Sequence, residues 1–252
     1  MRVFDHIGTR VFDRRRPAPN RDVAHSSRLA QNQGMSWLFG SAKRSMISPD
    51  DAMPGRARRT YRVPDRHAVL GTSLEGPWSA TTEVIYFGMG CFWGAERKFW
   101  KLPGVVSTAV GYQGGFSPNP SYEEVCTART GHTEAVMVAY EPAEASTYDL
   151  LKVFWENHDP TQVFRQGNDV GTQYRSAIYW TNPEQDRLAH TTRDAYNEVL
   201  VGKGFDPIST EIRSAADLAF YYAEEHHQQY LYKVPNGYDC HAHTGILLPA
   251  LA

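Results

Sequence analysis

Cys91 lies where two sequence patterns meet. A β-branched and aromatic run over residues 82–87 precedes it, two glycines form the turn, and a helix-like pattern follows. We expect the thiol at a helix N-terminus, where free backbone N–H groups and the macrodipole stabilise a thiolate and lower a cysteine pKa from about 8.5. A lone cysteine in such a place is more often a small buried side chain. Here the glycines leave the backbone approachable, and Phe92 and Trp93 supply an apolar pocket, so we favour a redox-active nucleophile.

The composition points to one catalytic domain with tails. The formal net charge is −2, which gives no electrostatic reason to bind nucleic acid or an anionic membrane. No apolar run approaches the roughly 18 residues that a membrane span needs. Cys91, Cys126 and Cys240 are too few and too scattered for a disulfide framework. We therefore expect a cytoplasmic protein in a reducing compartment, and a monomer, because no heptad pattern is sustained.

Two segments precede the compact part of the chain. Residues 1–34 are basic and polar without a periodic apolar face, which predicts a disordered extension. A transit peptide is opposed by three aspartates in that stretch, and a misassigned start before Met35 is an equal alternative. Over residues 35–81 proline and glycine interrupt every element, which favours an extended arm laid over the domain. A partly ordered tail is the alternative, and Trp37, Leu38, Val69, Leu70 and Trp78 are the candidate anchors.

The catalytic domain is expected over residues 82–234, followed by a C-terminal coil over 235–252. Alternating patterns predict strands over 82–87, 105–112, 133–140, 174–180 and 208–213. Helical spacing and end signals predict helices over 91–102, 147–158, 183–202 and 215–232. Strands and helices alternate unevenly. The fold class is therefore an α/β (α+β) two-layer sandwich, a mixed sheet with two or three helices on one or both faces.

Several motifs in order along the chain resemble the A-type peptide methionine sulfoxide reductases. The resemblance runs from about residue 83 to about 240 and involves independent segments, so chance does not explain it. The matching segments are Gly90-Cys91-Phe92-Trp93-Gly94-Ala95-Glu96, then 111–115 around Tyr112, 131–134 around Glu134, 158–161, and 167–176 around Asp169 and Tyr174.

The resemblance implies an oxidoreductase that reduces methionine S-sulfoxide, free or in proteins. Cys91 would attack the sulfoxide sulfur and become a sulfenic acid as methionine leaves. Glu134 would give a proton to the departing oxygen, which requires a carboxyl kept neutral near pH 7 by desolvation. From the residues alone, Glu134 is only an acid at the start of a strand, and a solvated surface acid is the simpler interpretation.

The same resemblance assigns five further side chains. Tyr112 and Tyr174 match tyrosines that hydrogen-bond the sulfoxide oxygen, since a phenol donates without carrying charge. Phe92 and Trp93 would cage the substrate methyl, although the buried face of the helix is an alternative for one of them. Asp169 would position water or a hydrogen bond.

The sulfenic acid needs a second thiol, and two candidates exist. Cys240 lies in a glycine-containing coil that resembles the mobile C-terminal segment of the family, and this implies a Cys91–Cys240 disulfide. Cys126 lies inside the domain at a position that is not a redox cysteine of the family, so a buried structural role fits it better.

This chain departs from a common family pattern. Many members carry another cysteine beyond the resolving one, but none occurs from His241 to Ala252. Thioredoxin, the implied external reductant and partner, would therefore attack the Cys91–Cys240 bond itself. Asp239 also places Cys240 one residue farther from the preceding Gly-Tyr than in many relatives. No bound cofactor is implied.

Two other kinds of function stay open on the residues alone. One is another thiol enzyme, a peroxidase or a transferase, and the other is a thiol redox sensor without catalysis. A zinc site is suggested by Cys240, His241 and His243, with His226 and His227 as partners. Adjacent helix residues point about 100° apart, however, so the two histidines do not make a closed four-ligand site. We expect no metal.

Overall fold

The computed structural model describes residues 43–240 and 242–251. The expectations for residues 1–34, and for Trp37 and Leu38 as anchors, concern segments outside this part. Within it, no helix is both long enough and apolar enough to cross a membrane.

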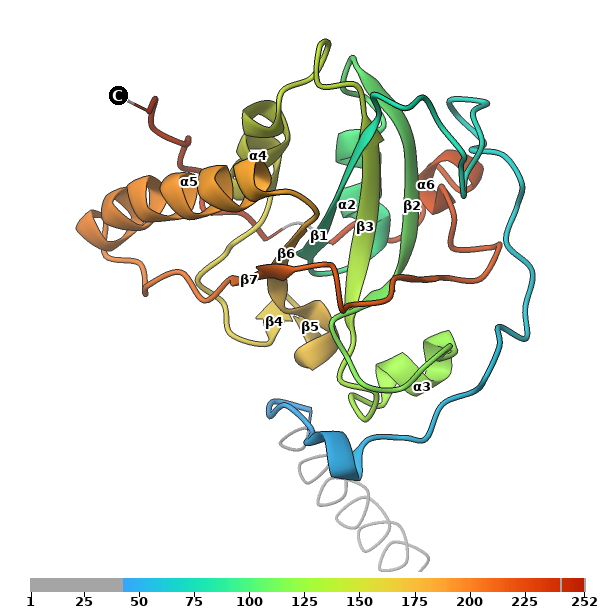
Figure 1. Ribbon diagram of the computed structural model, residues 1–252. Helices are drawn as coiled ribbons and strands as arrows, with labels where there is room; N and C mark the ends of the chain where they lie inside the picture. Colours follow the sequence, from blue (N-terminus) through green and yellow to red (C-terminus); the bar gives the residue numbers. More distant parts are fainter. Residues whose placement is uncertain (1–42, 241, 252) are drawn as a thin grey trace, which may run out of the picture. The chain divides into compact units, whose positions relative to one another are not determined.

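A six-stranded mixed sheet forms the centre of the domain (Figure 1). Its strands run in the order β7-β6-β1-β3-β2-β8, with β6 and β7 parallel and the other neighbours antiparallel. The strands are β1 (Glu83–Met89), β2 (Val105–Gln113), β3 (Thr133–Tyr140), β6 (Ser176–Trp180), β7 (Glu211–Ser214) and β8 (Tyr221–Tyr222). A separate two-stranded ribbon pairs β4 (Arg165–Gln166) with β5 (Asp169–Val170). The expected mixed sheet is confirmed.

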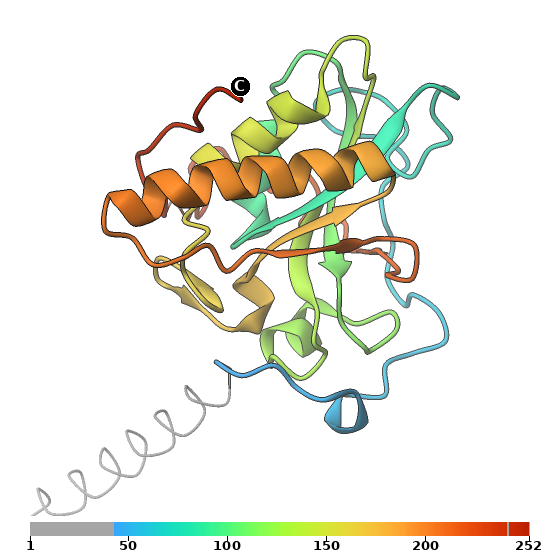
Figure 2. The same cartoon turned by 60° about the vertical axis from the view of Figure 1, so that its left-hand side comes forward.

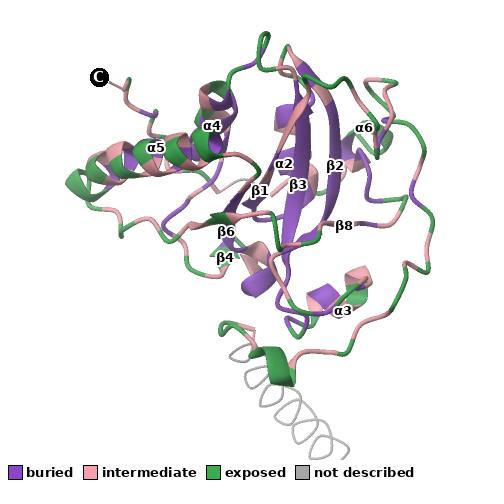
Figure 3. Ribbon diagram, viewed as in Figure 1, coloured by how far each residue is buried: buried purple, intermediate pink, exposed green. Residues whose placement is uncertain are grey.

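Helices pack on one face of this sheet and form the main core with it. They are α2 (Phe92–Phe99), α4 (Thr147–Glu156) and α5 (Pro183–Gly202), while α3 (Tyr122–Cys126) and α6 (Tyr230–Lys233) are short. Alternation along β1 turns Ile85, Phe87 and Met89 into this core. Helices α4 and α5 lie side by side in both views (Figure 2), and the central strands are buried (Figure 3).

The other face of the sheet is covered by the segment that precedes β1. Residues 43–81 contain only the short 3₁₀ helix η1 (Pro49–Asp51) and an isolated bridge between Arg66 and Ser73. Val63 and Leu74 are buried there against Met137 of β3, and Trp78 packs on the same cluster. These contacts are those expected of an extended arm laid over the domain. The division between arm and catalytic domain at residue 81 stays a prediction.

The capping signals act as the sequence predicts. Ser146 caps α4 in a reciprocal capping box with Asp149. Asn182 caps α5, and Pro183 occupies its first turn. The fourth strand begins later than expected, because Tyr174 belongs to the 3₁₀ helix η2 (Thr172–Tyr174) and pairing starts at Ser176.

The predicted helix over residues 215–232 is wrong. The segment supplies strand β8, which pairs with β2 at Gly111 and Tyr112, and only Tyr230–Lys233 are helical. The amide of Gln228 continues the edge, because it both accepts from Val110 N (2.9 Å) and donates to Val110 O (2.8 Å). The open edge of β2 thus gains partners that an isolated helix could not supply.

A buried carboxyl joins the arm, the sheet and the C-terminal segment. Glu96 on α2 accepts from Thr108 Oγ1 of β2 (2.9 Å) and from Gln229 Nε2 (2.7 Å). Thr108 also contacts His67 Nε2 of the arm (2.8 Å). Burial raises the pKa of Glu96 to about 7.

Candidate active site

Cys91 occupies the N-cap position of α2, directly after the end of β1. Its side chain is buried, with 8% of the residue exposed. Gly90 has φ +86°, and a Cβ there would lie 2.6 Å from the Gln166 side chain. The turn therefore requires glycine, and the predicted placement of the thiol at a helix N-terminus is confirmed.

The expectation of a lowered thiol pKa is wrong for the free site. Burial raises the pKa of Cys91 well above its ordinary value, and the charge of Glu134 raises it further. A backbone N–H of Trp93 acts in the opposite direction but does not outweigh them. Desolvation in this pocket thus raises the pKa of Cys91 by more than the backbone N–H at the helix N-terminus lowers it, and the resting thiol is neutral.

Glu134 is held at the same helix end. It is the second residue of β3, is 2% exposed, and its Oε2 accepts from the Phe92 backbone N–H at 3.0 Å. Burial raises its pKa to about 8. A proton donor requires a carboxyl that is neutral at pH 7 and close to the nucleophile. Glu134 meets both conditions, because it is hydrogen-bonded to the residue that follows Cys91.

Of the tyrosines near this carboxyl, Tyr112 is directed elsewhere. It is fully buried, and its hydroxyl donates to Glu224 Oε2 at 2.8 Å. Tyr122 at the start of α3 lies beside the aromatic wall of the site, with its ring 4.4 Å from that of His227. Burial raises its pKa, and the charges of Glu134, Cys126 and Cys91 raise it further. For Tyr174 the causes are burial, then Glu134 and Tyr122. The geometry therefore favours the pair Tyr122 and Tyr174.

Tyr122 was missed from the sequence, although a local signal marks its position. Ser121 and Glu124 form a capping box that starts α3 at Tyr122. The Tyr122 backbone N–H also donates to Glu224 Oε1 at 2.8 Å, so Glu224 holds both tyrosines. The capping box predicts a helix start, but it does not show which way the phenol points.

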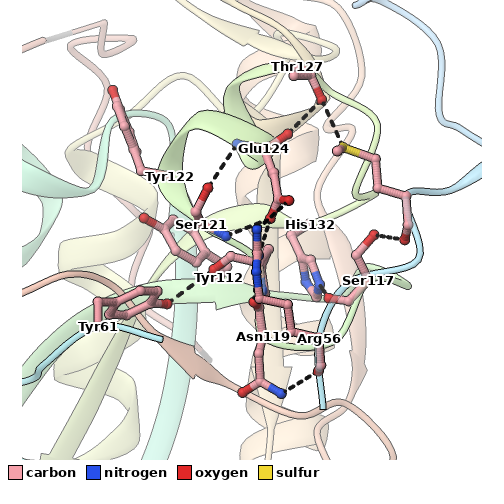
Figure 4. A network of polar contacts seen from close by, with 12 residues as sticks. Arg56, Tyr61, Tyr112, Ser117, Asn119, Ser121, Tyr122, Glu124, Thr127 and His132 are labelled. Atoms are coloured by element: carbon pink, nitrogen blue, oxygen red, sulfur yellow. Dashed lines mark hydrogen bonds and ion pairs between the residues drawn. The ribbon is translucent and has the colours of Figure 1, made fainter. Parts of the chain in front are cut away.

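The arm fixes α3 from the outside (Figure 4). Arg56 makes a two-pronged ion pair with Glu124, at 2.6 and 2.8 Å. Asn119 donates to the Arg56 carbonyl at 2.9 Å, and Tyr61 donates to the Pro120 carbonyl at 3.1 Å. These contacts position the loop that leads into Tyr122.

The two aromatics after the cysteine have different environments. Phe92 is 1% exposed and belongs to the main core. Trp93 is half-buried, its ring stacks on Tyr230 at 4.1 Å between centroids, and its Nε1 donates to His227 Nδ1 at 3.1 Å. The ring of His227 lies 5.3 Å from Phe92 and 4.4 Å from Tyr122. His227 therefore supports the aromatic wall of the site.

Cys240 and Asp169 lie next to each other beside the nucleophile. A small cavity is lined by both Cys91 and Cys240. The Cys240 thiol donates to the Gln166 carbonyl at 3.4 Å, and Tyr238 donates to Asp169 Oδ1 at 3.1 Å. Burial raises the pKa of Cys240, and a hydrogen bond with Asp169 raises it further. Asp169 thus contacts the C-terminal segment.

Cys126 is less buried than the sequence suggested. It ends α3 and is half-buried. Burial raises its pKa, while a hydrogen bond with Tyr122 lowers it. Its sulfur therefore lies next to the hydroxyl of Tyr122.

The histidines give no metal site in the part of the chain that the structure describes. Residues 43–240 and 242–251 hold no group of three or more histidine, cysteine or acidic side chains with suitable geometry. The ring centroids of His226 and His227 are 4.0 Å apart with the planes tilted by 41°, and His227 accepts a hydrogen bond from Trp93. His241 lies outside the described residues.

Comparison with known proteins identifies the family. The model of the peptide methionine sulfoxide reductase family matches residues 83–249. The chain belongs to the peptide methionine sulfoxide reductase family. A reductase of this name from Rhodospirillum centenum is 58% identical over 212 residues, which are 84% of this chain and 95% of that protein. The human mitochondrial reductase is 52% identical over 211 residues, 84% of this chain and 88% of that protein.

Solved structures agree with this assignment. Methionine sulfoxide reductase A of Corynebacterium diphtheriae matches with a TM-score of 0.74 and 45% identity, over 82% of this chain and 100% of that one. Reduced Mxr1 of Saccharomyces cerevisiae matches with a TM-score of 0.59 and 34% identity, over 69% and 96%. The reductase is thus an oxidoreductase of the methionine sulfoxide type, and the alternatives of a peroxidase or a redox sensor are not favoured.

Proposed function

We propose that the reductase reduces methionine S-sulfoxide, free or within proteins, with Cys91 as nucleophile and Glu134 as proton donor. The observation that carries this assignment is the buried Glu134 carboxyl. It accepts a hydrogen bond from the backbone N–H of Phe92, the residue after Cys91, and burial raises its pKa to about 8. Tyr122 and Tyr174 would hold the sulfoxide oxygen, and Phe92 and Trp93 would form the apolar wall for the methyl group.

The first step transfers the oxygen to Cys91. As the Cys91 sulfur attacks the sulfoxide sulfur, Glu134 gives its proton to the oxygen, and the proton lost by the thiol restores the Glu134 carboxyl. The S–O bond of the substrate breaks and an S–O bond forms on Cys91. The products are the thioether of methionine and a cysteine sulfenic acid, so Cys91 is oxidised by the two electrons that the sulfoxide gains.

The second step uses Cys240. Its sulfur attacks the sulfenic sulfur, a Cys91–Cys240 disulfide forms, and the oxygen leaves as water. An external dithiol of the thioredoxin type would then reduce this bond, since no cysteine follows Cys240 in the sequence. We place the enzyme in the cytoplasm because its few cysteines act as thiols. We propose a monomer because the sequence sustains no heptad pattern.

The assay that tests this function uses dithiothreitol and each epimer of a blocked methionine sulfoxide. The S epimer should be consumed and the R epimer should persist, while Cys91→Ser should abolish turnover. No turnover of either epimer would sink the proposal.

The role of Cys240 has its own test. Cys240→Ser should release one methionine per enzyme and then stop when thioredoxin is the reductant, and mass mapping of the wild type after one turnover should find the Cys91–Cys240 bond. Recycling by thioredoxin at the wild-type rate in Cys240→Ser would instead assign resolution to Cys126 or to an external thiol.

A further inference from the structure

An ion pair connects the helix of the nucleophile to the residue beside the resolving thiol. Arg97, in the last turn of α2, pairs through its Nη2 with Asp239 Oδ2. The two side chains are 27% and 18% exposed, so the pair is largely shielded from water. Asp239 is the residue next to Cys240, and Arg97 belongs to the helix that Cys91 caps.

The segment around Cys240 has no helix or strand of its own. After α6 ends at Lys233, residues 234–240 are turn and coil. Side-chain contacts hold it instead: Tyr238 donates to Asp169, and the Cys240 thiol donates to the Gln166 carbonyl. Farther along, Tyr196 on α5 donates to the Ile246 carbonyl at 2.8 Å. Near Cys240, the ion pair between Arg97 and Asp239 attaches this segment to α2.

The ion pair at Asp239 bears on the rate at which Cys240 forms the disulfide with Cys91. A sulfenic acid and a thiol on one chain react at a rate set by how often the connecting segment brings them together. A coil that samples many positions lowers that frequency. Asp239 limits this freedom one residue from the reacting sulfur and ties it to the same helix that fixes Cys91.

We propose that Arg97 and Asp239 are positioning residues for the second step, which hold Cys240 beside Cys91 until the sulfenic acid forms. The proposal rests on the proposed function. It concerns only the reaction of the Cys91 sulfenic acid with the Cys240 thiol, which yields the disulfide and water. The extra residue between Gly237-Tyr238 and Cys240 thereby has a role, because its carboxylate is the group that Arg97 binds.

The test separates the two chemical steps in Arg97→Gln and Asp239→Asn. Enzyme is mixed with saturating S-sulfoxide without reductant, and samples are quenched, alkylated and analysed for methionine and for the Cys91–Cys240 disulfide by mass. We expect the methionine burst to stay within about twofold of wild type. Disulfide formation should slow by about fivefold, the upper range for a partly shielded ion pair, and a sulfenic acid should become trappable by a dimedone-type probe.

Two controls distinguish positioning from general damage. Arg97→Lys keeps the charge and should keep most of the disulfide rate. Arg187→Gln removes an exposed ion pair with Glu184 on α5, whose side chains are 59% and 60% exposed, and should change neither step. High salt should slow disulfide formation in the wild type and not in the two variants.

The proposal is overturned if both variants form the disulfide at the wild-type rate, or if Arg97→Lys is as slow as Arg97→Gln. Loss of the methionine burst in the wild type would instead contradict the proposed function, so the two failures are distinguishable.

Discussion

At the scale of residues, the two reacting groups are both neutral in the free site. Burial raises the pKa of both Cys91 and Glu134. The charge of Glu134 raises the pKa of Cys91 further, and the charge of Asp169 raises that of Glu134. A neutral carboxyl can donate its proton, whereas the thiol must still lose one. Before substrate binds, the site therefore holds the protonated carboxyl of Glu134 beside a neutral Cys91 thiol.

The pH dependence of the first step follows from Glu134. Because its pKa in the folded protein is about 8, the protonated fraction falls as pH rises through that value. The methionine burst should therefore slow above pH 8, by about tenfold per unit. Glu134→Gln should cut the burst by roughly 10² at pH 7 and remove the decline. Rapid-quench measurements from pH 6 to about 10 check this, and an unchanged rate at neutral pH excludes the role.

Removal of the hydroxyl of Tyr122 and of Tyr112 should affect the methionine burst differently. Tyr122→Phe removes a donor at the site, and we expect the burst rate to fall by about tenfold or more. Tyr112→Phe removes a buried bond to Glu224, which should cost about 1–2 kcal/mol of unfolding free energy and leave the burst within about threefold. Burst kinetics and urea unfolding of both variants test these two expectations. The reverse pattern would restore Tyr112 as the oxygen ligand.

At the scale of elements, the arm and the short helix α3 form one support for the site. Helix α3 spans only Tyr122–Cys126, too short to be stable alone. Its capping box and the ion pair of Glu124 with Arg56 hold it in place. We therefore expect the arm to influence substrate binding through the position of α3.

Removing that support should weaken binding more than chemistry. Arg56→Ala releases Glu124 and the turn at Asn119, so Tyr122 loses its fixed position. We expect KM for the S-sulfoxide to rise by about three- to tenfold while kcat falls by less than about threefold, because the bound substrate still orders the loop. Arg187→Ala on α5 is the matched control. Equal KM values in the two variants would show that the arm has no such effect.

At the scale of the whole molecule, one sheet brings the reacting groups together from distant parts of the chain. Cys91 follows β1, Glu134 begins β3, and Tyr174 ends η2 just before β6, three strands that are neighbours in the sheet. The segment after α6 places Cys240 at the small cavity that Cys91 also lines. Cys91, Glu134 and Tyr174 thus meet although they are far apart in the sequence, because the sheet order differs from the sequence order.

The sequence by itself determined the features that depend on local order. Alternation and helix end signals located most strands and helices, and the glycine turn before Cys91 predicted its place at a helix N-terminus, because these patterns arise between residues a few positions apart. Only the tertiary structure decided the rest. Burial raises the pKa of Cys91 despite the helix end, the hydroxyl of Tyr112 donates to Glu224, and the edge of β2 pairs with strand β8 where a helix was predicted. Desolvation, side-chain direction and free sheet edges depend on partners far away in the chain, so no local pattern specifies them.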